Sequence, residues 1–101
     1  MQLTYNNQSL LATGCYEKID GGVTNFGREV IKEMNRVGIV IDMSHSAEKS
    51  TLDAIEISEK PIAITHANPS FWHNAKRNKS ETLLKALSES GGMLGLSLYP
   101  H

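Results

Sequence analysis

Two histidines stand at matching places in the sequence, each directly after a short apolar run. His45 ends "GIVIDMSH" and His66 ends "PIAITH". If these runs are neighbouring parallel strands, they lie about 4.8 Å apart and their carboxyl ends meet at the edge where ligands bind. Neutral imidazoles are common zinc ligands, so the pair could converge on one metal ion. The alternative is a hydrogen-bonded loop histidine in each case, and no H-x-H, H-x-D or H-E-x-x-H motif completes a catalytic zinc site.

A carboxylate lies inside the first of these apolar runs. Asp42 precedes His45 by three residues in "IVIDMSH". A carboxylate among apolar residues must be paired or hydrogen-bonded. Strand alternation predicts that it faces away from His45. We expect a structural carboxylate bonded to neighbouring backbone amides, and a role in orienting an imidazole is the alternative.

A long loop follows the second histidine. It reads "HANPSFWHNAKRNKS" and carries two aromatic residues, a third histidine, His73, and the basic pair Lys76–Arg77. Loops after the strands of α/β folds build substrate pockets. Arg77 could hold a substrate carboxylate through two parallel N–H bonds. A solvated basic turn is the alternative for both basic residues.

Strands and helices that would position these groups alternate along the chain. Four apolar runs, residues 1–5, 38–44, 61–66 and 93–99, have the near-continuous hydrophobicity that is typical of parallel strands covered on both faces. Helical patterns separate them. The first begins at Thr24 or Asn25 and ends at Gly38, with an expected core stripe of Phe26, Val30, Met34 and Val37.

Two further helical patterns follow. One begins after Ser46 and ends before Pro61, and the other begins at Ser80 and ends at Gly91. Strand–helix alternation of this kind predicts an α/β fold with parallel strands and right-handed crossovers. Residues 1–101 are expected to form a single domain. Two architectures fit this order, an open doubly wound sheet and a segment of a (β/α)8 barrel, and the spacing alone does not distinguish them.

Composition narrows the class of protein. Hydrophobic residues make up 40% and charged residues 21%, which excludes disorder as the default. The formal net charge of −1 offers no basic field for nucleic acid. No apolar stretch approaches the roughly 20 residues of a membrane span, and the first residues have no signal-peptide pattern. The single Cys15 fits a reducing compartment, so we expect a cytoplasmic protein.

Three segments together resemble the membrane dipeptidase (renal dipeptidase) family of zinc-dependent hydrolases of dipeptides. They are "MQLTYN", "GCYEKIDGGVTNFGREVIKEMNRVGIVIDMSHSAEKSTLDAIEISEKPIAITHANPS" and "KRNKSETLLKAL". The resemblance covers essentially all of the chain. Its most specific parts are "FGREVIKEMNRVGIVIDMSH", the strand end "ITHA", and the "RN" dipeptide eleven residues after His66. It implies about half of a (β/α)8 TIM-like barrel.

The resemblance also implies roles for individual residues. It makes His45 and His66 ligands of the same one of two Zn²⁺ ions, which together activate a water molecule. It makes Arg77 the group that binds the C-terminal carboxylate of a dipeptide, and it puts Tyr99 in the substrate pocket. Tyr5 stands where mammalian members have a histidine, which puts the substrate-polarising role of that histidine in doubt here.

Other parts of the family's metal site have no counterpart in this sequence. An H-x-D pair, a bridging glutamate and a later aspartate are expected outside these residues, so the chain resembles a central fragment with about four of the eight strands. We therefore expect the isolated chain to be nearly inactive and able to self-associate through open sheet edges. The alternative is a non-catalytic α/β module that assembles with a partner or has lost activity. An open flavodoxin-like domain is a weaker alternative, because no glycine-rich phosphate loop is present.

Overall fold

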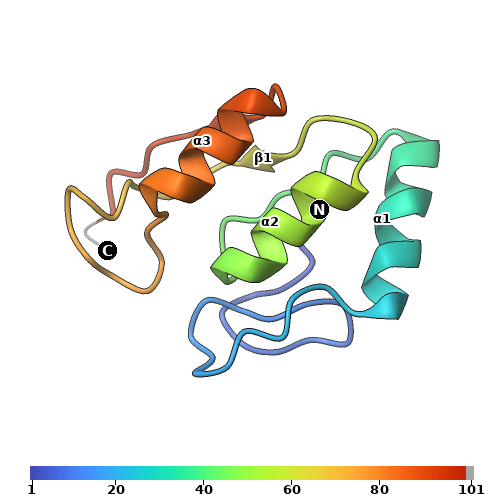
Figure 1. The fold of residues 1–101 in the computed structure, drawn as a ribbon, viewed down its shortest axis with the longest axis horizontal. Coiled ribbons are helices and arrows are strands. Elements are labelled where there is room, and N and C mark those ends of the chain that lie inside the picture. The colour runs from blue at the N-terminus through green and yellow to red at the C-terminus, as the bar shows by residue number, and fades with distance from the viewer. Residues whose placement is uncertain (100–101) are drawn as a thin grey trace.

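The computed structural model describes residues 1–99, which form helices packed beside a narrow parallel sheet (Figure 1). In chain order the elements are α1 (Asn25–Val37), α2 (Glu48–Ile57), β1 (Ala63–Ile64), α3 (Glu81–Glu89) and β2 (Met93–Leu94). β1 and β2 run parallel, with Ala63 opposite Met93. Two more segments join the sheet through single parallel bridges, from Gln2 to Asp42 and from Asp42 to Ala63. Four extended segments thus lie side by side in sequence order.

The predicted strands are confirmed in position and direction but are wrong in length. Residues 1–5 and 38–44 keep only isolated bridges, and the other two runs pair over two residues each. A physical reason lies at Asp42, whose Oδ1 accepts hydrogen bonds from the backbone amides of Ser44 and Thr65. Amides that bond to a side chain cannot extend the ladder between strands. The sheet therefore gives way to loops just before each histidine.

The three predicted helices are confirmed, and local caps explain two of their starts. Thr24 caps α1 by accepting a hydrogen bond from the amide of Gly27 at 2.9 Å, and Ser80 caps α3 through the amide of Leu83 at 3.1 Å. Gly38 ends α1 with φ at 82°, a left-handed conformation that glycine adopts without steric cost. The N-cap residue of α2, Ala47, has no capping side chain.

The core lies between the helices and the strands, and α2 packs against both α1 and α3 (Figure 1). The predicted stripe of α1 is partly wrong, because Phe26 and Val37 are exposed. The buried stripe is Gly27, Ile31 and Met34, which also follows helical spacing but is rotated by about one residue. The cluster includes Ile41, Met43, Ile62 and Ile64 from the strand segments, and Ala54, Leu83 and Leu87 from α2 and α3.

Several apolar side chains of the strand segments remain outside this core. Val40, Met93, Leu96 and Leu98 are all more than half exposed. None of the helices within residues 1–99 has the length and apolar character needed to cross a membrane. These exposed apolar side chains are consistent with the predicted self-association, which stays a prediction.

Candidate metal and substrate site

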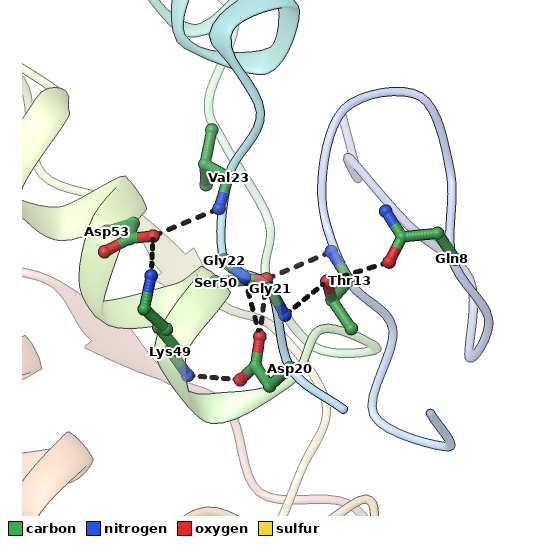
Figure 2. A network of polar contacts seen from close by, with 9 residues as sticks. All are labelled: Gln8, Thr13, Asp20, Gly21, Gly22, Val23, Lys49, Ser50 and Asp53. Carbon is green, nitrogen blue, oxygen red and sulfur yellow. Dashed lines mark hydrogen bonds and ion pairs between the residues drawn. The ribbon is translucent and has the colours of Figure 1, made fainter. Parts of the chain in front are cut away.

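The loop that precedes α1 is fastened to the start of α2 by a network of polar contacts (Figure 2). Asp20 accepts hydrogen bonds from the amide of Lys49 at 2.6 Å and from the hydroxyl of Ser50 at 3.2 Å. This carboxylate takes the place of the missing N-cap of α2. Ser50 in turn accepts a hydrogen bond from the amide of Thr13, and Asp53 accepts one from the amide of Val23. The network fixes the path of the segment that brings Asn6 and Tyr16 to the site.

The two predicted histidines meet at the carboxyl end of the sheet. The Nε2 atoms of His45 and His66 lie 3.0 Å apart, and the ring centroids are 5.0 Å apart at 60°. Tyr5 stacks on His45 with ring centroids 4.1 Å apart, which helps to fix the plane of the imidazole. His45 is buried, with 6% of its surface exposed. The matching positions in the sequence therefore correctly predicted two converging imidazoles.

Each imidazole forms a hydrogen bond through Nδ1, the ring nitrogen that does not face the other histidine. His45 Nδ1 lies 2.7 Å from Asn6 Oδ1, an atom that can only accept, so Nδ1 carries the proton. His66 Nδ1 lies 2.9 Å from Thr65 Oγ1. The Thr65 hydroxyl donates its proton to Asp42 Oδ2 at 2.6 Å, so it must accept from His66 Nδ1. In their neutral forms both rings consequently turn an unprotonated Nε2 toward each other.

Asp42 combines the two roles that its sequence position left open. It accepts hydrogen bonds from the amides and hydroxyls of both Ser44 and Thr65, so it is a structural carboxylate. It also reaches His66 indirectly, through the Thr65 hydroxyl. Burial alone would raise the pKa of Asp42, but these hydrogen bonds outweigh it and lower that pKa. The carboxylate is therefore ionised at neutral pH and holds both strand ends.

Two cations from the loop before α3 are buried against the segment that carries His45. Arg77 donates from Nη1 to the carbonyl of Ser44 and from Nη2 to the carbonyl of His66, the latter at 2.9 Å. Lys79 Nζ donates to the carbonyls of Met43 at 3.2 Å and Ser46 at 2.9 Å. Burial lowers the pKa of Lys79 to about 8. The alternative of a solvated basic turn is wrong for Arg77, which is 5% exposed, whereas the neighbouring Lys76 is exposed.

A cavity of about 390 Å³ opens above the two histidines. Arg77 and Tyr99, the residues expected to bind substrate, both line it. The other lining residues are Tyr5, Asn6, Tyr16, His45, His66 and Ser97. All three tyrosines of the chain thus border one cavity that also holds the imidazoles and a buried guanidinium. This composition suits a small polar ligand with a carboxylate.

The pKa of His45 is lowered to about 4, chiefly by burial and further by the positive charges of Arg77, His66 and Lys79. In the metal-free chain we expect the His45 ring to stay neutral until the pH approaches 4, whereas the ordinary pKa of a histidine is 6.5. The unfolded chain binds this proton more readily, so the contribution of His45 to stability is complete above pH 6.5 and is lost as the pH falls toward 4. An NMR titration of the His45 ring, with the urea-unfolded chain as control, measures this shift. Titration of folded His45 near the ordinary value would contradict the burial argument.

Apart from Asp42, sequence reasoning missed the residues that support the histidines. A hydroxyl residue directly precedes each of them, in "MSH" and "ITH", and this shared pattern was the available signal for Ser44 and Thr65. Asn6 and Tyr16 gave no such signal, because they enter the site through long-range contacts of the first loop. His73, in contrast, lies exposed in the loop before α3 and does not line the cavity.

Comparison with known proteins places this arrangement in a class. An amidohydrolase from Pseudomonas aeruginosa matches with a TM-score of 0.91 and 46% identity, over 94% of this chain and 29% of that one. A metallo peptidase from Rhodobacter sphaeroides, solved with a phosphinate mimic of the dipeptide L-Ala-D-Ala, matches with a TM-score of 0.87 and 28% identity, over 94% and 29%. The fold is accordingly α/β, with parallel strands and alternating β/α units that make up about half of a (β/α)8 TIM-like barrel.

The family follows from the sequence match. The model of the membrane dipeptidase family, peptidase family M19, matches residues 1–101, and the chain belongs to this family of metallopeptidases. Dipeptidase tcpJ from Claviceps purpurea is 32% identical over 82 residues, which is 81% of this chain and 19% of that protein. The chain thus spans about a fifth of this curated relative and under a third of the two solved structures.

Proposed function

We propose that these residues are part of a zinc-dependent dipeptidase, in which His45 and His66 bind the same metal ion. The observation that carries the proposal is the pair of Nε2 atoms, 3.0 Å apart and both without a proton in the neutral rings. Two lone pairs facing each other repel unless a cation lies between them. Two nitrogen ligands of one tetrahedral zinc ion are about 3.3 Å apart, so the observed separation fits a shared metal.

The chemistry of the donor set also favours zinc. Imidazole nitrogen is a preferred ligand of this ion, and the low pKa of His45 keeps its ring neutral, with Nε2 unprotonated, at pH 7. When bound, the metal supplies Lewis-acid chemistry, by which a carbonyl is polarised and a water molecule is activated for hydrolysis. The family's binuclear arrangement requires further ligands, and residues 1–99 contain no cluster of three or more His, Cys, Asp or Glu that could hold a metal.

The other cavity residues bind and orient the substrate in this proposal. Arg77 has N–H groups beyond the two that hold the Ser44 and His66 carbonyls, and it lines the cavity. It would bind the C-terminal carboxylate of the dipeptide, and Tyr99 would border the same substrate. A cavity of about 390 Å³ limits the substrate to a small molecule, which agrees with a preference for very short peptides.

A chimera tests this function in a complete barrel. Residues 1–99 replace the aligned segment of the Rhodobacter metallo peptidase, and hydrolysis of L-Ala-D-Ala is measured with added zinc. We expect a folded, active chimera whose kcat/KM falls at least about 100-fold in His66→Ala, because the metal loses a direct ligand. The parent enzyme and the exposed-site variant His73→Ala serve as controls. A folded chimera without activity would contradict the proposal.

The second candidate is a non-catalytic module that assembles with a partner. It is favoured by the exposed apolar residues of the sheet and by the incomplete ligand set within residues 1–99. Zinc content and mass in solution distinguish the two. A metal-free monomer supports the inert module, and stoichiometric zinc in an assembled species supports the metal site.

A further inference from the structure

The supports of the two imidazoles come from different parts of the chain but do the same thing. Asn6 lies in the first loop and reaches His45, whereas Thr65 directly precedes the histidine that it supports. Each presents a hydrogen-bond acceptor to Nδ1 and so leaves Nε2 free to bind. A hydrogen-bonded outer nitrogen fixes both the tautomer and the orientation of a histidine ligand.

The backbone of Asn6 is itself held in an unusual conformation. Among residues 1–99, Asn6 is the only non-glycine residue with positive φ, at 64°. Asparagine tolerates this left-handed conformation better than most residues. Gly14 lies directly against it, and a Cβ at Gly14 would come within 2.2 Å of the carbonyl carbon of Asn6. Two features of the backbone thus fix the position of the Asn6 side-chain amide. One is the close contact with Gly14, and the other is a left-handed conformation that few residue types adopt.

The support of His66 is a relay of hydroxyl and carboxylate. Asp42 Oδ2 accepts the proton of the Thr65 hydroxyl, and the Ser44 hydroxyl donates to Asp42 Oδ1 at 2.6 Å. The hydroxyl oxygen of Ser44 also accepts a hydrogen bond from the backbone amide of His66 at 3.1 Å. Both the ring and the backbone of His66 are therefore tied to the strand end that carries His45.

We propose that Asn6 and Thr65 are positioning residues that hold His45 and His66 as Nδ1–H tautomers and aim both Nε2 atoms at one metal ion. This inference rests on the proposed function in one respect: it assumes that a metal ion binds to both His45 and His66. It assigns the asparagine after the first strand segment a role in metal affinity, although that residue lies thirty-nine positions from the histidine that it supports.

The test uses the full chain, with zinc alone as the probe. Asn6→Gly keeps the left-handed backbone and removes the acceptor, and Thr65→Val keeps the shape and removes the hydroxyl. Asn6→Asp and Thr65→Ser restore an acceptor at each place. We expect zinc affinity to fall about 10–100-fold in Asn6→Gly and Thr65→Val. In Asn6→Asp and Thr65→Ser we expect an affinity close to that of wild type. In zinc-loaded wild type, the Nδ1–H protons of both rings should give hydrogen-bonded NMR signals, and each should disappear in the matching variant.

The outcomes separate this inference from the proposed function. If wild type binds zinc through both Nε2 atoms but Asn6→Gly and Thr65→Val match it in affinity and in Nδ1–H signals, the positioning roles are overturned. If wild type shows no zinc at these nitrogens, the inference fails in its metal-binding form, and the chimera tests the proposed function separately. Loss of affinity without rescue by Asn6→Asp or Thr65→Ser also counts against positioning, because a merely structural disturbance would produce it. Circular dichroism confirms that each variant is folded.

Discussion

Arg77→Met should lower the free energy of unfolding by about 2–4 kcal/mol, because it leaves two carbonyl groups without a donor. Arg77 is 5% exposed, and its guanidinium donates to the carbonyls of Ser44 and His66. The first carbonyl belongs to the residue before His45 and the second to His66 itself, so the planar fork of Arg77 joins both strand ends. Methionine fills much of the same space but cannot donate. Urea unfolding followed by circular dichroism measures the difference.

Two further variants identify the cause of that loss. Arg77→Lys keeps the charge but cannot reach two carbonyls with a rigid fork, so an intermediate loss is expected. Arg28→Met, on the exposed face of α1, removes the same type of side chain and should change stability by no more than about 0.5 kcal/mol. A stability of Arg77→Met equal to that of the Arg28 variant would show that the two carbonyl contacts contribute nothing.

The second large effect concerns metal binding by the isolated chain. Replacing either His45 or His66 by alanine should weaken zinc binding by at least about 100-fold, which corresponds to about 2.7 kcal/mol. The loss should exceed that of removing an outer hydrogen-bond partner, since a direct ligand disappears. Competition with a chromophoric chelator measures the affinity. His73→Ala is the matched control, because this histidine is exposed and lies outside the cavity.

The helices were predictable because their signals are local. Thr24, Ser80 and Gly38 mark helix ends in the sequence, and the structure uses each of them as a cap. The lengths of the strands were not predictable, because Asp42 diverts the amides of Ser44 and Thr65 from the ladder. The contact with Thr65 joins residues 23 positions apart, which no local sequence pattern reveals.

The candidate site likewise has residues that could be predicted from the sequence and contacts that could not. His45 and His66 were predictable from equal positions on successive strands, and the resemblance to a family pointed to Arg77 and Tyr99 as neighbours of the same cavity. What the sequence could not reveal is how Arg77 is held, since its carbonyl partners, Ser44 and His66, lie 33 and 11 positions earlier in the chain. The contribution of Asn6 depends on a loop path fixed by contacts such as that of Asp20 with the amide of Lys49.

The most direct test of the metal site is a zinc titration of the chain, observed through the ¹⁵N resonances of its histidine rings. We expect the Nε2 signals of His45 and His66 to shift together and to saturate at one equivalent of zinc, while their Nδ1 atoms stay protonated. Zinc that shifts the His73 ring and leaves both of these Nε2 signals unchanged would contradict a metal ion shared by His45 and His66.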